Sequence, residues 1–245
     1  MTRAPAAARH RAALALIFLA VTITTAREGA IRVLVVTGGH DYPTGFYTLF
    51  HGHPDVRWDH RAHRAPADGY GRDMAKRYDV VVLYDMEQDA PETQRRNLMD
   101  FVRAGRGVVA LHHAIASMPQ WKEFHDLIGG KYLQESEAGR PPSTYQHDVR
   151  MRIHVADRTH PVTRGIDDFE IEDEVYGGLS LSPDAHVLLT TDHPASTKAV
   201  AWVTPNAHAR VVTIQPGHGE PAFADASYRR LVIQAIRWAA RRDRM

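Results

Sequence analysis

Apolar runs alternate with amphipathic stretches along the first half of the chain. Residues 30–39, 78–85 and 107–113 are largely apolar, as expected of strands covered on both faces of a parallel sheet, and the last of them ends on two histidines. The stretch 91–105 opens on a proline, has apolar residues at helical spacing and closes on a glycine. This alternation predicts parallel βαβ units with right-handed crossovers, and therefore an α/β fold.

The remaining elements have less regular patterns. We expect helices from Thr44, with that residue as the N-cap, from about Pro119 to Gly129, and over 226–242. We expect a half-exposed strand over 55–61, further strands over 147–156, 185–192, 198–204 and 209–217, and a long loop over 134–146. The later strands predict an antiparallel extension that returns to the main sheet.

Residues 1–26 have the pattern of a secretory signal peptide. Arginines precede an apolar run over 12–21, and small residues follow it. The run is shorter than the ~20 residues that a transmembrane helix needs. We therefore expect cleavage of this segment, which leaves one exported domain over 30–245 without a transmembrane segment. The alternative is an uncleaved anchor, or a start codon placed upstream of a cytosolic protein.

The composition restricts the class of partner. Among 245 residues, 44% are hydrophobic and the formal net charge is +1, so the chain has no electrostatic field suited to nucleic acid or an acidic membrane. We expect a small molecule as the partner, and the pattern leaves the oligomeric state open. The absence of cysteine excludes a cysteine nucleophile and a thiolate metal site.

Histidines follow three of the predicted strands. His40 follows the first strand, His112 and His113 end the strand that starts at Gly107, and His218 follows the last. Because ligands of an open parallel sheet bind outside the carboxyl ends of its strands, we expect these imidazoles to meet at one crevice. Adjacent residues at a strand end face opposite ways, and we favour His113 over His112 as the inward one. The alternative is that the histidines only cap strand ends.

An acidic stretch over 167–178 contributes one more candidate. Most of its carboxylates suit a solvated face. Glu174 precedes an aromatic residue and a Gly-Gly turn, and beside imidazoles it would be a metal ligand, a general base or the group that orients a protonated histidine. Solvated surface charge is the alternative for Glu174. We expect surface positions for other histidines, namely His51, His53, His60, His63 and His186.

The motifs taken together resemble one family. The blocks VLVVTGGHDY, YDVVVLYD, FVRAGRGVVALHHA, WKEFHDLIGG, HPVTRGI, EDEVY, AWV and PGHG occur in the order found in the ThuA-like proteins, named for a trehalose-utilisation gene product. The resemblance implies a flavodoxin-like (class I glutamine amidotransferase-like) three-layer sandwich with a mainly parallel sheet. Those amidotransferases have a cysteine at the sharp turn after a strand. This chain has LHHA there and no cysteine, so amidotransferase chemistry is excluded.

The resemblance also implies a role in carbohydrate catabolism through 3-keto sugars. We expect a hydrolase or lyase that acts on a disaccharide glycoside or 3-keto-glycoside by elimination, hydrolysis or isomerisation. A base together with a Lewis acid on the carbonyl oxygen is sufficient for such steps. We expect His40, His113 and His218 to bind a divalent ion such as zinc, with Glu174 and His112 as the catalytic residues.

Sugar binding has its own candidates. We expect Asp41, Tyr42, Tyr176 and Trp121 to contact a carbohydrate substrate, the aromatic residues by stacking on sugar rings. Core packing is the alternative for the aromatic residues, above all for Trp121, which stands near Phe124 in the predicted helix. The second hypothesis for the whole protein is a non-catalytic carbohydrate-binding protein.

Overall fold

The computed structural model describes residue 1, residues 29–63 and residues 69–243. The signal peptide expected over 1–26 lies outside the described residues. Within them, one sheet of nine strands has the order β2-β1-β3-β4-β11-β10-β9-β6-β7. Its strands are β1 (Ile31–Gly38), β2 (Val56–Ala62), β3 (Val80–Asp85), β4 (Gly107–Leu111), β6 (Thr144–Val155), β7 (Phe169–Gly177), β9 (His186–Thr191), β10 (Ala199–Thr204) and β11 (Val211–Ile214). A separate antiparallel pair consists of β5 (Gly130–Lys131) and β8 (Ser180–Leu181).

The sheet has a parallel and an antiparallel half. Strands β2, β1, β3, β4 and β11 run parallel to one another. From β11 onward, β10, β9, β6 and β7 each pair antiparallel with the preceding neighbour. The predicted extension and its return to the main sheet through β11 are therefore confirmed.

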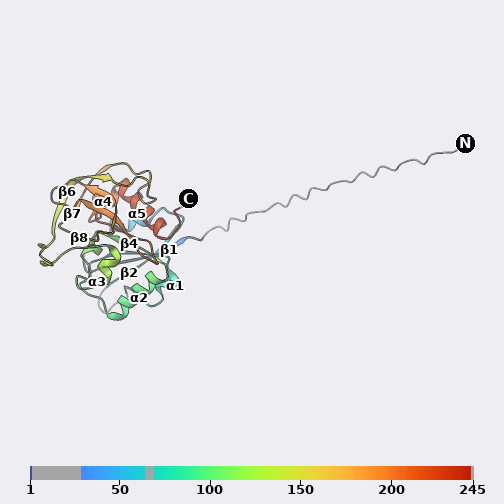
Figure 1. The fold of residues 1–245 in the computed structure, drawn as a ribbon, viewed down its shortest axis with the longest axis horizontal. Helices are drawn as coiled ribbons and strands as arrows, with labels where there is room; N and C mark the ends of the chain where they lie inside the picture. The colour runs from blue at the N-terminus through green and yellow to red at the C-terminus, as the bar shows by residue number, and fades with distance from the viewer. Residues whose placement is uncertain (2–28, 64–68, 244–245) are drawn as a thin grey trace.

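Helices cover both faces of the sheet, which makes three layers (Figure 1). One face carries η1 (Thr44–Phe50), α4 (Glu220–Ala224) and α5 (Ala226–Ala239), and the other carries α1 (Met74–Arg77), α2 (Glu92–Arg103) and α3 (Lys122–Ile128). Residues of β1 alternate between them: Val33 and Val35 pack under the first set, Leu34 and Val36 under the second. Both faces of the central strands are buried, which is why their sequences are continuously apolar. No helix within the described ranges combines the length and apolar character that crossing a bilayer requires.

Several boundaries differ from the sequence predictions. Thr44 is the first residue of a 3₁₀ helix rather than an N-cap, and extended Pro43 precedes it. α3 begins at Lys122 because a tight turn, in which the Trp121 N–H donates to the Met118 oxygen, comes first. β6 begins at Thr144, so the loop before it is shorter than predicted.

The acidic stretch that we expected to be mostly a solvated face forms strand β7. Glu170 and Glu172 are exposed, whereas Ile171, Asp173 and Glu174 are buried. Exposed and buried residues alternate from Glu170 to Asp173, and from Asp173 onward both faces of the strand are buried, which the charged residues hide from a hydrophobicity pattern. As a result, β7 brings two carboxylates into the interior.

Candidate functional site

The carboxyl ends of four parallel strands meet at one edge of the sheet. There β1 ends at Gly38, β3 at Asp85, β4 at Leu111 and β11 at Ile214. The register pairs Leu111 with Ile214, so the segments that follow these two strands start side by side. This is the edge at which ligands of open α/β sheets bind.

His112 occupies a sharp turn at this edge. The strand predicted to reach His113 ends at Leu111, and η2 (His112–Ala116) follows directly. The His112 backbone has a φ of 39°, a left-handed conformation that costs a non-glycine residue on the order of 1–3 kcal/mol. Its Nδ1–H donates to the backbone oxygen of Gln215 at 2.6 Å. This bond orients the imidazole so that Nε2 faces Glu174.

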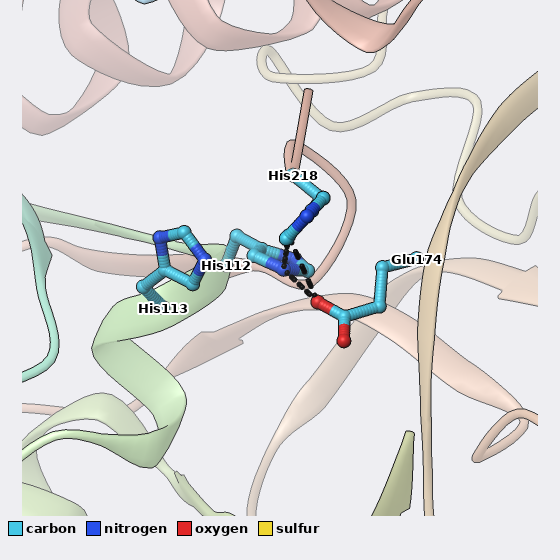
Figure 2. A group of neighbouring side chains, drawn as sticks. All are labelled: His112, His113, Glu174 and His218. Carbon is cyan, nitrogen blue, oxygen red and sulfur yellow. Dashed lines mark hydrogen bonds and ion pairs between the residues drawn. The ribbon is translucent and has the colours of Figure 1, made fainter. Parts of the chain in front are cut away.

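Four side chains gather beside this turn: His112, His113, Glu174 and His218, whose ligand atoms all lie within 4.8 Å of one another. Figure 2 shows Glu174 Oε2 directed at the imidazoles of His112 and His218. The oxygen is 2.8 Å from His112 Nε2 and 3.0 Å from His218 Nδ1, and the two nitrogens are 3.3 Å apart. Tetrahedral zinc bonds of about 2.0–2.1 Å place ligand atoms about 3.3 Å apart. The cluster could therefore hold a metal ion.

Glu174 reaches the cluster although β10, β9 and β6 separate β7 from β11 in the sheet. The Asp173 carboxylate accepts hydrogen bonds from the backbone N–H groups of Gly217 at 2.5 Å and His218 at 2.9 Å. The Gln215 amide donates to the Glu174 backbone oxygen at 2.9 Å. Burial raises the pKa of Asp173. These bonds hold the end of β7 against the loop after β11, and so hold Glu174 against His218.

The imidazoles and the carboxylate shift one another's pKa values. Burial works to raise the pKa of Glu174, but hydrogen bonds from His112 and His218 outweigh burial and hold it well below its ordinary value. The bond to Glu174 raises the pKa of His218, with burial opposing it. Glu174 is therefore a carboxylate at neutral pH, which is the form that binds a metal.

His113 is the member of the cluster without a hydrogen bond. Its side chain is 1% exposed, and neither ring nitrogen has a partner among the described residues. Its ring packs against those of His40 and Tyr84, with centroids 4.1 and 4.8 Å away. Burial, reinforced by the neighbouring imidazoles, lowers the pKa of His113. A neutral imidazole with a free nitrogen is the form in which histidine binds metals.

The stability of the protein should fall as the pH drops below about 6.5. Unfolded His113 takes up a proton near its ordinary pKa of ~6.5, whereas its lowered pKa keeps it neutral in the folded state. That proton lowers the free energy of unfolding by up to about 1.4 kcal/mol per pH unit. His218 acts oppositely: its raised pKa adds stability that is present at low pH and lost as the pH rises through the folded value.

Denaturant unfolding in chelator at about pH 7, 6 and 5 measures the free energy of unfolding, and a change at His113 isolates its contribution. The variant His113→Gln should lose less stability than the parent between the highest and lowest pH, because glutamine takes up no proton. Equal losses in the two proteins would show that His113 titrates alike in both states.

A cavity of about 260 Å³ opens beside the cluster, and we call it the tyrosine cavity. Its lining comprises Tyr132, Tyr145, Tyr176, His113, His147 and Glu174, together with His40, Met86, Ala116 and Gln134. Tyr176 stacks on His112 with centroids 4.7 Å apart, and Tyr145 is 61% exposed. A larger hollow of about 1010 Å³ beside α3 and β8 shares no lining residue with the cluster, so we place the site at the tyrosine cavity.

Asp41 and Tyr42 lie in a neighbouring depression of about 600 Å³, which we call the β1 hollow. Its lining comprises Thr37, Gly38, Gly39, His40, Asp41, Tyr42, His60 and Ala62. His40 is not one of the four clustered ligands, but it lines both hollows. Trp121 lines neither hollow: it is 4% exposed and stacks on Phe124 in the core beneath α2 and α3.

His147 joins the site through a β-bulge and was not among the sequence candidates. The register of β6 against β7 shifts between Gln146 and Val149. The bulge brings His147 Nδ1 to 3.7 Å from Glu174 Oε1, with its ring centroid 4.8 Å from that of His218. Bulges re-aim side chains near active sites, but they depend on the partner strand. The only signal in the sequence was a histidine at the start of an alternating segment.

The surface position expected for His63 is wrong. His63 is 2% exposed, and its Nδ1 lies 3.0 Å from Asp85 Oδ2. Tyr70 donates to the same oxygen at 2.9 Å. Because His63 and the Tyr70 hydroxyl share this carboxylate oxygen, a histidine next to a predicted edge strand is tolerated in the interior, although Asp85 Oδ1 has no partner among the described residues.

Comparisons with known proteins give the family and the fold. The model of the ThuA family, described as trehalose utilisation, matches residues 32–239. No curated protein matches the sequence. A ThuA-like protein from Parabacteroides merdae ATCC 43184 is 18% identical with a TM-score of 0.74, over 86% of this chain and 90% of that one. Another from Bacteroides uniformis ATCC 8492 is 18% identical with a TM-score of 0.63, over 89% and 94%.

The same fold forms part of a larger enzyme. A catalytic mutant of the β-galactosidase Gan42B from G. stearothermophilus is 12% identical with a TM-score of 0.55, over 86% of this chain but 30% of that one. At such identities the likeness establishes the fold alone. The predicted α/β fold class is confirmed.

Proposed function

Because the chain belongs to the ThuA family, described as trehalose utilisation, we propose that it is a metal-dependent hydrolase or lyase that acts on a glycoside or 3-keto-glycoside. The observation that carries the proposal is the cluster of His112, His113, Glu174 and His218, of which His113 and Glu174 line the tyrosine cavity. Export of the enzyme is part of the proposal and rests on the pattern of residues 1–26 alone.

The donor atoms fit a divalent ion of the first transition row. Three imidazoles and one carboxylate, without a thiolate, suit zinc and its neighbours in that row. One of the two buried, unpartnered nitrogens of His113 would be satisfied by such an ion. The bond from His112 Nδ1 to Gln215 is the outer contact that usually orients a metal-binding imidazole. This supports His112 as a ligand rather than a catalytic residue.

The chain's own groups can then move a proton at the substrate. A bound divalent ion supplies a Lewis acid that polarises a substrate carbonyl or hydroxyl oxygen. Glu174 directs Oε2 at two imidazoles, while its Oε1 lies 3.7 Å from His147 Nδ1, and both residues line the tyrosine cavity. We assign proton transfer at the carbon beside the carbonyl to His147, since an imidazole serves as an acid or a base, whereas the pKa of Glu174 is held well below its ordinary value and its carboxylate is assigned to the metal. Tyr145, which is 61% exposed, offers a face for a sugar ring.

The test combines metal content with turnover. The full-length protein, loaded with zinc and desalted, should retain about one ion per chain by elemental analysis. It should convert 3-ketotrehalose to monosaccharide products, and chelator should abolish both the bound zinc and the conversion. The variant His154→Ala should retain both the zinc and the conversion. It removes a histidine that pairs with Asp168 and Asp192 away from the cluster.

Two results would contradict the proposal in different ways. Failure of the loaded protein to retain zinc would remove the metal site. Retained zinc and sugar binding without turnover would identify a non-catalytic carbohydrate-binding protein instead.

A further inference from the structure

The tyrosine cavity and the β1 hollow share a thin wall. His40 lines both of them. Its neighbour Gly39 has a φ of 70° and lies so close to the backbone of Met86 that a Cβ there would be 2.4 Å from the Met86 oxygen. Gly39 lines the β1 hollow and Met86 lines the tyrosine cavity. One imidazole and two backbone segments in contact therefore stand between the two spaces.

The volumes suggest that the two spaces are used together. Ligand pockets usually have volumes of about 300–1,000 Å³. The tyrosine cavity, at about 260 Å³, is smaller than this, and the β1 hollow adds about 600 Å³. Because His40 lines both spaces, a ligand that is too long for the tyrosine cavity would extend past it into the β1 hollow.

The charge of the lining indicates which chemistry the β1 hollow accepts. Its lining contains the carboxylate of Asp41 and neither lysine nor arginine. Within the described part of the chain, that carboxylate has no hydrogen-bond or ion-pair partner, and Asp41 is exposed. A free carboxylate without a nearby cation repels phosphate and other anions, and it accepts hydrogen bonds from neutral hydroxyl groups.

The other polar groups of the β1 hollow are already fixed in place. The Tyr42 hydroxyl donates to Thr37 Oγ1 at 2.8 Å, and His60 Nε2 lies 2.8 Å from the same oxygen. Tyr42 Oη also lies 2.7 Å from the Tyr47 hydroxyl. A wall whose side chains hold one another is pre-organised, so binding requires little further ordering.

We propose that the β1 hollow binds the second ring of a two-ring glycoside whose first ring occupies the tyrosine cavity. Asp41 accepts hydrogen bonds from hydroxyl groups of that second ring, and the bond between the rings passes His40. This inference rests on the proposed function, because it takes the tyrosine cavity as the place of the reacting ring. It makes Asp41 the residue that distinguishes a disaccharide from a monosaccharide.

The test compares the binding of trehalose and glucose to the zinc-loaded full-length protein by calorimetry. The parent should bind trehalose at least about tenfold more tightly than glucose, since hydrogen bonds to a charged group carry that much affinity. Asp41→Ala should lower the trehalose affinity to that of glucose and leave the glucose affinity unchanged. Ala62→Trp should do the same by filling the hollow from an exposed position at the end of β2.

The matched control is Asp167→Ala, which removes a fully exposed carboxylate outside both hollows and should preserve the preference for trehalose. Equal affinities of the parent for the two sugars would overturn the inference while the proposed function stands. So would a preference that survives both Asp41→Ala and Ala62→Trp. Binding of neither sugar by the parent would overturn the inference together with the carbohydrate part of the proposed function.

Discussion

Glu174→Gln should lower the affinity for zinc by more than about 100-fold. The change removes the negative charge of the oxygen that lies 2.8 Å from His112 Nε2 and 3.0 Å from His218 Nδ1. Loss of an outer contact to a metal ligand already costs about 10–100-fold in affinity, so loss of a charged ligand costs more. The glutamine has nearly the same shape, and the backbone oxygen at 174 keeps its bond from Gln215. The fold should therefore be retained.

The measurement is a competition titration with a chromophoric zinc chelator. Glu172→Gln is the matched control, because Glu172 lies on the same strand and is exposed to solvent. It should bind zinc as the parent does. An affinity of Glu174→Gln within about tenfold of the parent would show that the carboxylate is not a ligand.

Trp202→Ala should destabilise the protein by about 3–5 kcal/mol. Trp202 on β10 is fully buried and packs with Ile115, Tyr176 and Leu179. Its indole N–H donates to the backbone oxygen of Ile128 at 2.8 Å. Truncation removes the largest side chain of this group and leaves a void that the surrounding strands can only partly close. Because Ile115 belongs to η2 and Tyr176 stacks on His112, zinc affinity should fall as well.

Denaturant unfolding of the chelator-treated proteins measures the loss of stability. Trp202→Phe is the informative control, because it keeps an aromatic ring and removes the N–H group. The Ile128 oxygen still accepts a hydrogen bond from Thr213 Oγ1 at 2.7 Å, so it is not left unpaired. This variant should lose only about 1–2 kcal/mol. A loss below about 1 kcal/mol for Trp202→Ala would show that the strands close around the void.

The sequence could predict that histidines gather at the strand ends, because two local rules were sufficient. Continuous apolar runs identify strands covered on both faces, and parallel strands present their carboxyl ends at one edge. His113 and His218 follow such runs and lie in the cluster. His40 follows another apolar run and packs against His113, with ring centroids 4.1 Å apart. The order of those strands did not need to be known for this.

The sequence could not decide which of His112 and His113 points into the crevice. It depends on where β4 ends and on the left-handed turn at His112, and bonds to the Gln215 oxygen and to Glu174 orient the imidazole. The sequence pattern extended the strand to His113 because nothing local marks the change from strand to turn. Both imidazoles lie in the cluster, with ring centroids 4.7 Å apart.

By itself, the sequence determined the α/β fold class, the family motifs and the edge of the sheet at which imidazoles gather, since each depends on residues near one another in the chain. Only the tertiary structure decided that Asp173 and Glu174 are buried, that a bulge brings in His147, and that Trp121 packs in the core. The physical reason is that these positions depend on partners far along the chain. The Asp173 carboxylate is buried because the N–H groups of Gly217 and His218 bond to it, and no local pattern contains that pairing.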